Sequence, residues 1–163
     1  MYDGNWINGL KHGQGVYTYA GSGNCYSGEW KNDLKDGTGT FKYESLNEVY
    51  EGEFKNDKKN GKGVYVYSDG TKYVGSFSDE LKDGEAELYY ADGSYFKGIF
   101  KNGKKNGLGK FVYNNGDIYE GEFSNNIRQG RGEYISKSGK RFVCDWHQDA
   151  PVKAKRLPPA VSN

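Results

Sequence analysis

The chain has 163 residues, a length that suits one ordinary domain or a short repeat array. Lysine and arginine number 23 and aspartate and glutamate 22, so the formal net charge is only +1, which argues against a general nucleic-acid binder. No apolar run approaches the about 18 residues of a membrane span, and no hydrophobic signal-peptide core follows Met1. We therefore expect a cytoplasmic protein without a nucleic-acid partner.

A repeat of 23 or 24 residues runs through the sequence, and an aromatic residue starts each unit. The units begin at residues 2, 26, 50, 73, 96 and 119, and a partial unit begins at residue 142. Of the 26 aromatic residues (15 Tyr, 8 Phe and 3 Trp), 24 stand at four positions of this register: the first residue and those 4, 15 and 17 places later. Such a pattern indicates a repeat architecture, in which neighbouring units bury each other's apolar face.

Each unit is predicted to form a β-hairpin, as the third unit illustrates. Residues 50–54 alternate aromatic or glycine with glutamate, the period of a strand with one apolar face, and residues 63–67 alternate similarly. Residues 55–61 between them are polar and end in glycine, and residues 68–70 predict a tight turn into the next unit. No segment has the spacing of an amphipathic helix. We predict an all-β fold, an elongated single-layer antiparallel sheet of about six to seven stacked hairpins.

The leading ring and the glycine two residues later are predicted to pack together. Glycine stands at this position in the first six units, and Cys144 replaces it in the seventh. Because glycine has no Cβ, an aromatic ring can lie flat over it. Replacing such a glycine should therefore disturb packing more than local chain flexibility.

Residues 2–146 form the repeat array, and residues 147–163 differ from it in composition. This C-terminal extension contains all three prolines (Pro151, Pro158 and Pro159) together with lysine and arginine, so we expect an irregular segment that caps the last sheet edge. At the other end Met1 directly precedes the first strand, which has no visible cap. We expect that end either to pair with a partner, including end-to-end self-association, or to continue in a longer protein.

Residues that could carry catalysis do not form a recognisable constellation. No G-x-G-x-x-G segment opens a helix, and no phosphate-binding loop is present. The paired glutamates Glu51/Glu53 and Glu120/Glu122 are predicted to lie on the solvated face of exposed strands, where nothing would raise a carboxyl pKa. We therefore expect a protein that is not an enzyme.

Metal and disulfide sites are also not expected. Cys25 and Cys144 lie far apart in the sequence, and two thiols do not make a disulfide framework. His12 and His147 are the only histidines, so a metal cluster would need nearly all of both residue types across the whole chain. The sequence predicts no cofactor and no metal.

The register resembles the MORN repeat (membrane occupation and recognition nexus), with a pattern near YxGxWxxGxxxGxGxxxxxxG. The segments 26–30 (YSGEW), 50–54 (YEGEF) and 119–123 (YEGEF) match its start, and 12–15 (HGQG) and 60–63 (NGKG) match its middle. The resemblance covers residues 2–146, although Ala86 replaces one glycine in the fourth unit. It implies an elongated, gently twisted single-layer sheet with a groove lined by aromatic rings.

The aromatic face is the leading candidate for a binding surface. Rings at all four register positions are predicted to project to one side of a sheet that has no second layer, and exposed apolar surface usually marks an interaction site. A groove of this kind could receive an extended peptide or an amphipathic helix; the alternative is that the rings are saturated by stacking on one another. The residues assigned to this groove are Trp6, Tyr26, Trp30, Tyr50, Phe54, Tyr73, Phe77, Phe96, Phe100, Tyr119 and Phe123.

Basic residues of the turns form a second candidate surface. MORN proteins have been linked to phosphoinositides, and a basic rim would attract anionic headgroups. Acidic residues share these turns, so the alternative is a set of solvated turn charges. The residues assigned to lipid contact are Lys55, Lys58, Lys59, Lys101, Lys104 and Lys105.

Three functions follow from these surfaces. The leading hypothesis is a non-catalytic scaffold or adaptor that binds a protein segment along the aromatic groove, in a cytoskeletal or ciliary assembly; residues 71–75 and 84–88 are similar to repeats of the radial-spoke-head type. The alternative is a phosphoinositide-binding module at the cytosolic membrane face. A carbohydrate-binding array is the third, since exposed aromatic ladders also suit sugars.

Overall fold

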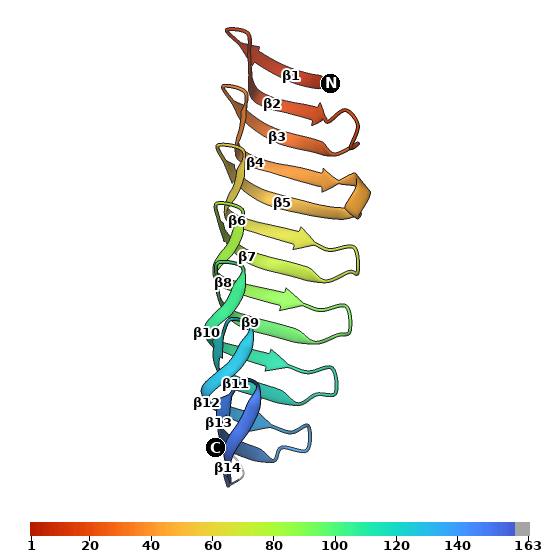
Figure 1. The fold of residues 1–163 in the computed structure, drawn as a ribbon. Helices are drawn as coiled ribbons and strands as arrows, with labels where there is room; N and C mark the ends of the chain where they lie inside the picture. Colours follow the sequence, from red (N-terminus) through yellow and green to blue (C-terminus); the bar gives the residue numbers. More distant parts are fainter. Residues whose placement is uncertain (159–163) are drawn as a thin grey trace, which may run out of the picture. The chain divides into compact units, whose positions relative to one another are not determined.

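The computed structural model describes residues 1–158, which form strands in sequence order within two compact units. The first unit, Met1–Lys82, and the second unit, Asp83–Asn163, each contain an antiparallel sheet in which consecutive strands pair (Figure 1). The first unit contains β1 (Tyr2–Ile7), β2 (Leu10–Thr18), β3 (Cys25–Lys31), β4 (Leu34–Tyr43), β5 (Glu48–Lys55), β6 (Lys58–Val66) and β7 (Lys72–Ser78). The second contains most of β8 (Leu81–Tyr89), and β9 (Tyr95–Lys101), β10 (Lys104–Val112), β11 (Ile118–Ser124), β12 (Ile127–Ile135), β13 (Arg141–His147) and β14 (Ala150–Arg156).

The predicted all-β hairpin architecture is confirmed in both units. The one helical element in the described residues is a short 3-10 turn, η1 (Glu44–Leu46), which connects β4 to β5. No helix in residues 1–158 has the length and apolar character needed to cross a membrane.

Side chains alternate along the strands as the sequence predicts. In β5, Tyr50 and Phe54 are buried, whereas Glu51 and Glu53 are exposed. One face of the strand thus carries the apolar residues and the other faces solvent.

The connection within each hairpin is shorter than the sequence predicts. In the third repeat only Asn56 and Asp57 lie outside the strands, and both have positive φ values, of 47° and 69°. A two-residue turn with positive φ at both positions matches the right-handed twist of the two antiparallel strands that it joins. The polar residues 58–61 already belong to β6, so the expectation of a polar connection over residues 55–61 is wrong in its length.

Glycine pairs sit where the strands bend. Gly52 and Gly63 face each other across β5 and β6, and the register shifts between Gly52 and Phe54. A Cβ on Gly52 would lie 2.5 Å from the Cα of Gly63 and 2.6 Å from the hydroxyl of Tyr50. The leading ring therefore lies on bare backbone, as predicted.

The core is a stack of aromatic rings from successive repeats. The ring of Tyr26 meets that of Trp30 edge to face, with centroids 5.1 Å apart, and meets Phe54 of the next repeat in the same way at 5.0 Å. In the second unit Phe96 contacts Phe123 of the next repeat at 5.1 Å. Edge-to-face contacts of this kind add to the free energy gained from burying the rings.

Residues 150–156 of the C-terminal extension form a regular strand, so the expectation of an irregular segment is wrong there. Strand β14 pairs antiparallel with β13, from His147↔Ala150 to Phe142↔Arg156. Pro151 lies in β14 at a register shift, and β14 is exposed along its length. Because a proline lacks an N–H, it is tolerated where a strand has a free edge or a bulge. Pro159 lies outside the described residues.

Candidate protein-binding groove

Ten of the eleven residues assigned to the groove are buried. The leading rings Tyr26, Tyr50, Tyr73, Phe96 and Tyr119 are 0% exposed, and Trp30, Phe54, Phe77, Phe100 and Phe123 are at most 6% exposed. Trp6 on β1 is the exception, at 57%. The alternative that rings are saturated by stacking on one another therefore describes these ten, because rings of neighbouring repeats pack together within each unit. Their contact with a partner stays a prediction.

The accessible rings of this face are those at the third and fourth aromatic positions of the repeat. We call them the aromatic wall; in the first unit they are Tyr17, Tyr19, Phe41, Tyr43, Tyr65 and Tyr67, and in the second Tyr90, Phe111, Tyr113 and Tyr134. Neighbouring rings touch along each unit, with centroids 4.6 Å apart for Tyr65–Tyr67 and 5.9 Å for Tyr43–Tyr65. All of them except Phe41 remain partly exposed.

A basic residue nine places after each leading ring lies over the same face. We call these residues the cation row: Lys11, Lys35, Lys59 and Lys82 in the first unit, and Lys105 and Arg128 in the second. The Nζ of Lys35 lies 4.9 Å from the ring centroid of Phe41 and 5.6 Å from that of Phe54. Cations held over ring faces are attracted by the ring quadrupole.

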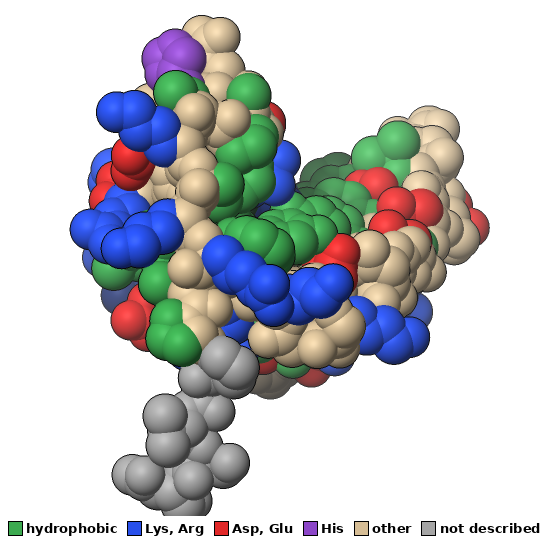
Figure 2. Space-filling model, turned by 90° about the horizontal axis from the view of Figure 1, so that it is seen from below, with side chains coloured by type: hydrophobic (Ala, Val, Ile, Leu, Met, Phe, Trp, Pro, Cys, Tyr) green, Lys and Arg blue, Asp and Glu red, His purple; other side chains and the backbone are tan. Residues whose placement is uncertain are grey.

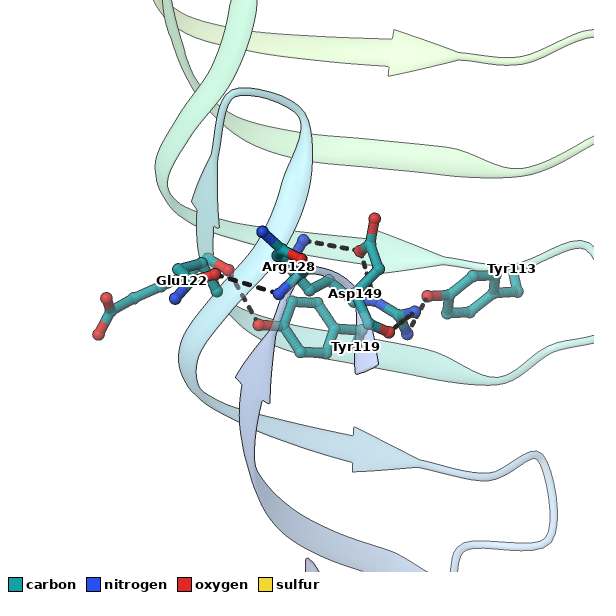
Figure 3. Close-up of polar contacts among 7 residues, drawn as sticks. Tyr113, Tyr119, Glu122, Arg128 and Asp149 are labelled. Carbon is teal, nitrogen blue, oxygen red and sulfur yellow. Dashed lines mark hydrogen bonds and ion pairs between the residues drawn. The ribbon is translucent and has the colours of Figure 1, made fainter. Parts of the chain in front are cut away.

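Arg128 shows how this row is held in the second unit (Figure 3). Its guanidinium donates to the hydroxyl of Tyr113 (3.1 Å) and through Nε to Oδ1 of Asp149 (3.1 Å). It also lies 4.0 Å from the ring centroid of Trp146. Beneath it the hydroxyl of Tyr119 donates to the carbonyl of Glu122 (3.0 Å). The cation thus joins the wall to the core.

The backbone of the cation row is fixed by the turn of the following hairpin. Asp57 donates its N–H to the carbonyl of Lys35 and accepts the N–H of Lys35 on Oδ1, both at 2.9 Å. Asp33 and Lys11, Glu80 and Lys59, Asn126 and Lys105, and Asp149 and Arg128 repeat this two-bond clasp. The following repeat therefore positions these five of the six cations.

The members of the row differ in their charge environment. Burial lowers the pKa of Lys35, while Asp57 and Glu80 act in the opposite direction. Burial also acts to lower the pKa of Lys59, but its hydrogen bonds to Glu80 and Tyr43 raise that pKa overall. Lys59 thus has a carboxylate partner 3.0 Å away, whereas the ammonium of Lys35 lies over rings.

The six lysines assigned to lipid contact do not share one surface. Lys59 and Lys105 belong to the cation row on the aromatic face. Lys58 forms an ion pair with Asp79 and Lys101 forms one with Asp83, both at 3.2 Å. Lys55 and Lys104 are exposed. The expected basic rim is therefore divided between two faces and partly neutralised by acidic turn residues.

The paired glutamates have structural partners in the sheet. Glu53 accepts the N–H of Lys62 on Oε1 at 2.7 Å, and Glu120 forms an ion pair with Lys110 at 2.6 Å. Both are exposed, as predicted. In the part of the chain that the structure describes, no three His, Cys, Asp or Glu residues are arranged to hold a metal ion, and Cys25 and Cys144 are free thiols.

The cation row was missed as a group by the sequence reasoning. Lys59 and Lys105 were grouped with neighbouring turn lysines, and Lys11, Lys35 and Lys82 were not assigned. The signal was present: a basic residue recurs nine places after every leading ring of the six full units. Figure 2 shows hydrophobic side chains along a hollow in the surface, with lysine and arginine side chains beside it.

Comparisons with known proteins agree with the repeat register. Six consecutive segments match the family model described as the MORN repeat, over residues 2–23, 26–47, 50–72, 73–95, 96–118 and 119–141. No curated protein sequence matches significantly.

Two solved structures with a similar arrangement of strands are TCP-type domains. One is the TCP domain of Drosophila melanogaster SAS-4 in complex with a proline-rich motif of Ana2, at 15% identity and a TM-score of 0.47, covering 90% of this chain and 84% of that one. Another is the TCP10 domain of Danio rerio CPAP, at 16% identity and a TM-score of 0.38, covering 91% and 79%. At these values the likeness concerns the fold alone.

Proposed function

Because the chain belongs to the MORN-repeat family and presents an aromatic wall beside a row of cations, we propose that it is a non-catalytic scaffold that binds a protein segment along this groove. The observation that carries the proposal is that these two sets of side chains recur in register on one face. Partly exposed tyrosines such as Tyr43 and Tyr67 offer large, rigid contact surfaces, the kind that dominates binding energy at protein interfaces.

The rigid backbone under the groove supports the same function. The clasps that hairpin turns make with five of the six cations, and the rings packed on the glycine pairs, fix the groove before any partner arrives. A preformed surface loses little conformational entropy on binding, so more of the contact energy appears as affinity.

The proposed setting is a cytoplasmic cytoskeletal or ciliary assembly, of which the radial spoke is one example. Its support is the similarity of residues 71–75 and 84–88 to radial-spoke-head repeats. The tagged protein should then co-sediment with isolated axonemes or cytoskeletal fractions. Recovery in the soluble fraction alone would argue against this setting and leave the binding function open.

Site-specific photo-crosslinking tests the groove directly. A photoreactive side chain replacing Tyr43 would face the groove, and one replacing Glu51 would face the opposite side of the sheet. In an extract of the cells that express the protein, we expect a discrete crosslinked partner from position 43 and none from position 51. Equal yields from the two positions would reject the groove as the binding surface.

Flotation with vesicles containing phosphatidylinositol bisphosphate tests the lipid alternative in parallel. Lys55 and Lys104 are the two of the six assigned lysines that are exposed and form no ion pair within residues 1–158, so that alternative now depends mainly on them. Flotation at physiological salt that is lost when both are changed to glutamate, together with no crosslink from position 43, would favour the lipid function.

A further inference from the structure

We propose that the groove of the first unit binds an acidic amphipathic α-helix whose carboxylates recur every seven residues. This inference rests on the proposed function and names the chemistry of the partner. It follows from the charge of the cation row, from its spacing, and from the rings beside it.

The charge of the row selects an acidic partner. Lys35 places its ammonium 4.9 Å from Phe41, 5.6 Å from Phe54 and 5.8 Å from Tyr26. Within residues 1–158 this ammonium contacts these rings and forms no ion pair. Asp57, whose charge acts on this ammonium, directs its Oδ1 to the backbone N–H of Lys35. A carboxylate entering the groove would therefore find a half-buried cation that forms no ion pair within residues 1–158.

The neighbours of Lys35 in the row extend this preference along the groove. Lys11 lies over Tyr17 and Trp30, and its Nζ is 3.9 Å from Oδ1 of Asp33. Lys59 lies over Tyr65 and is paired with Glu80. Acidic groups of a partner would thus meet cations at three successive repeats, and basic groups would be repelled. Charge complementarity of this kind sets specificity and register.

The spacing of the row fits an α-helix better than a β-strand. Successive cations are separated by two strands, which is about 9.5 Å in an antiparallel sheet. Residues seven apart lie on the same side of an α-helix, about 10.5 Å from each other. On one face of a peptide in β-strand conformation the side chains recur at about 6.6 or 13 Å, and neither distance fits. The flexible lysine stems can absorb the remaining difference of about 1 Å for the helix.

The aromatic wall supplies the apolar half of the site. Tyr43, Tyr65 and Tyr67 lie beside the cations and are partly exposed. Apolar residues three or four positions after each carboxylate would lie on the same helix face and contact these rings. The predicted partner is therefore a helix with glutamate or aspartate at one heptad position and leucine-like residues following it.

A designed peptide tests the proposal with the full chain. The probe is a fluorescent helix of three heptads, about 21 residues, with glutamate at one heptad position, leucine three and four places later, and alanine or glutamine elsewhere. Two control peptides have the same length and the same leucine content: one carries lysine in place of glutamate, and one keeps the probe's composition with the glutamates moved to every fifth position. Fluorescence anisotropy should show binding of the probe that weakens as salt rises, and at least tenfold weaker binding of each control.

Variants of the chain locate the contact. Lys35→Gln should weaken probe binding about tenfold, Lys35→Arg should restore it, and Lys42→Gln should leave it unchanged because Lys42 lies on the opposite face of the same strand. Thermal unfolding of each variant checks that the fold is kept. If Lys35→Gln proves unstable, Lys11→Gln provides the same comparison at the neighbouring repeat.

Several outcomes would overturn the inference. If the respaced peptide binds as tightly as the probe, the heptad helix is rejected. If Lys35→Gln and Lys11→Gln both bind the probe as tightly as the wild type does, the cation row is rejected as the contact. Vesicles containing phosphatidylinositol bisphosphate that bind in a Lys35-dependent way, when the peptide does not bind, would assign the row to lipid. A crosslinked partner at position 43 without binding of the acidic helix would overturn this inference and leave the proposed function standing, whereas loss of that crosslink would reject the function itself.

Discussion

The hydroxyl of Tyr50 donates a hydrogen bond to the backbone carbonyl of Glu53, 2.8 Å away, across the bend of strand β5. The ring between these two ends lies on Gly52 and Gly63, which leaves no room for a Cβ at either position. The same bond joins Tyr26 to Glu29, Tyr73 to Ser76 and Tyr119 to Glu122. In four repeats, therefore, a buried leading tyrosine connects the two sides of the strand bend through this hydrogen bond.

Phe96→Tyr should stabilise the second unit, because Phe96 is the one leading ring of the buried series that lacks this hydroxyl. By analogy with Tyr119, the new phenol would donate to the carbonyl of Ile99. A buried hydrogen bond of this kind contributes about 0.5–1.5 kcal/mol to the free energy of unfolding. Urea unfolding checks the gain, with Tyr119→Phe as the matched control that should lose a similar amount. A loss of stability in Phe96→Tyr would show that the fifth repeat cannot accommodate the hydroxyl.

Gly52→Ala should destabilise the first unit strongly. Its Cβ would lie 2.5 Å from the Cα of Gly63, a backbone atom that cannot move aside cheaply. Overpacking in a close-packed core costs about 1–3 kcal/mol, and we expect the upper part of this range here because backbone is involved.

Gly70→Asn is the matched control for this prediction. Gly70 has φ of +88° and nothing within 4 Å of a built Cβ, and asparagine tolerates this region of φ. Its free energy of unfolding should change by less than about 1 kcal/mol. Urea unfolding measures both variants. If the free energy of unfolding falls by a similar amount in each, the backbone conformation, and not the close approach of the strands, is the reason for glycine at position 52.

The repeat register, the strands and the ring-on-glycine packing could be predicted from the sequence because each depends on neighbours within one or two repeats. The burial of Phe54 could not, since it depends on the bend between Gly52 and Phe54 that folds the ring against Tyr26 and Tyr50. A period of two residues assigns a side chain to one face of the sheet, but it does not predict how deeply that side chain is buried there. Lys59 was misplaced for the same reason, because Lys58 and Lys59 are adjacent in sequence and point to opposite faces of β6. The strand at 150–156 was missed because prolines lower strand propensity except at a free edge.

Asp57→Ala should weaken the contact between neighbouring hairpins. The substitution removes the acceptor for the N–H of Lys35, and the loss of a partly exposed clasp of this kind costs about 1 kcal/mol in the free energy of unfolding. Asp57→Asn should cost less than half as much, because Asn126 makes the same clasp with Lys105 in the second unit. Urea unfolding of the two variants separates the hydrogen bond from the charge. Equal losses would indicate that the carboxylate charge, and not the acceptor, stabilises the turn.

Alkaline pH should destabilise the first unit in part through Tyr67. Burial raises the pKa of its phenol from 10.0 to about 12, and Glu48 and Asp69 add to the shift. In the unfolded chain the phenol titrates near its ordinary value, so the unfolded state binds fewer protons than the folded state between these two values. The stabilisation is therefore complete below about pH 10 and is lost as the pH rises toward about 12. Urea midpoints measured across this range should fall for the wild type and fall less steeply for Tyr67→Phe, which has no proton to release. Parallel declines for the two proteins would show that Tyr67 titrates alike in the folded and unfolded states.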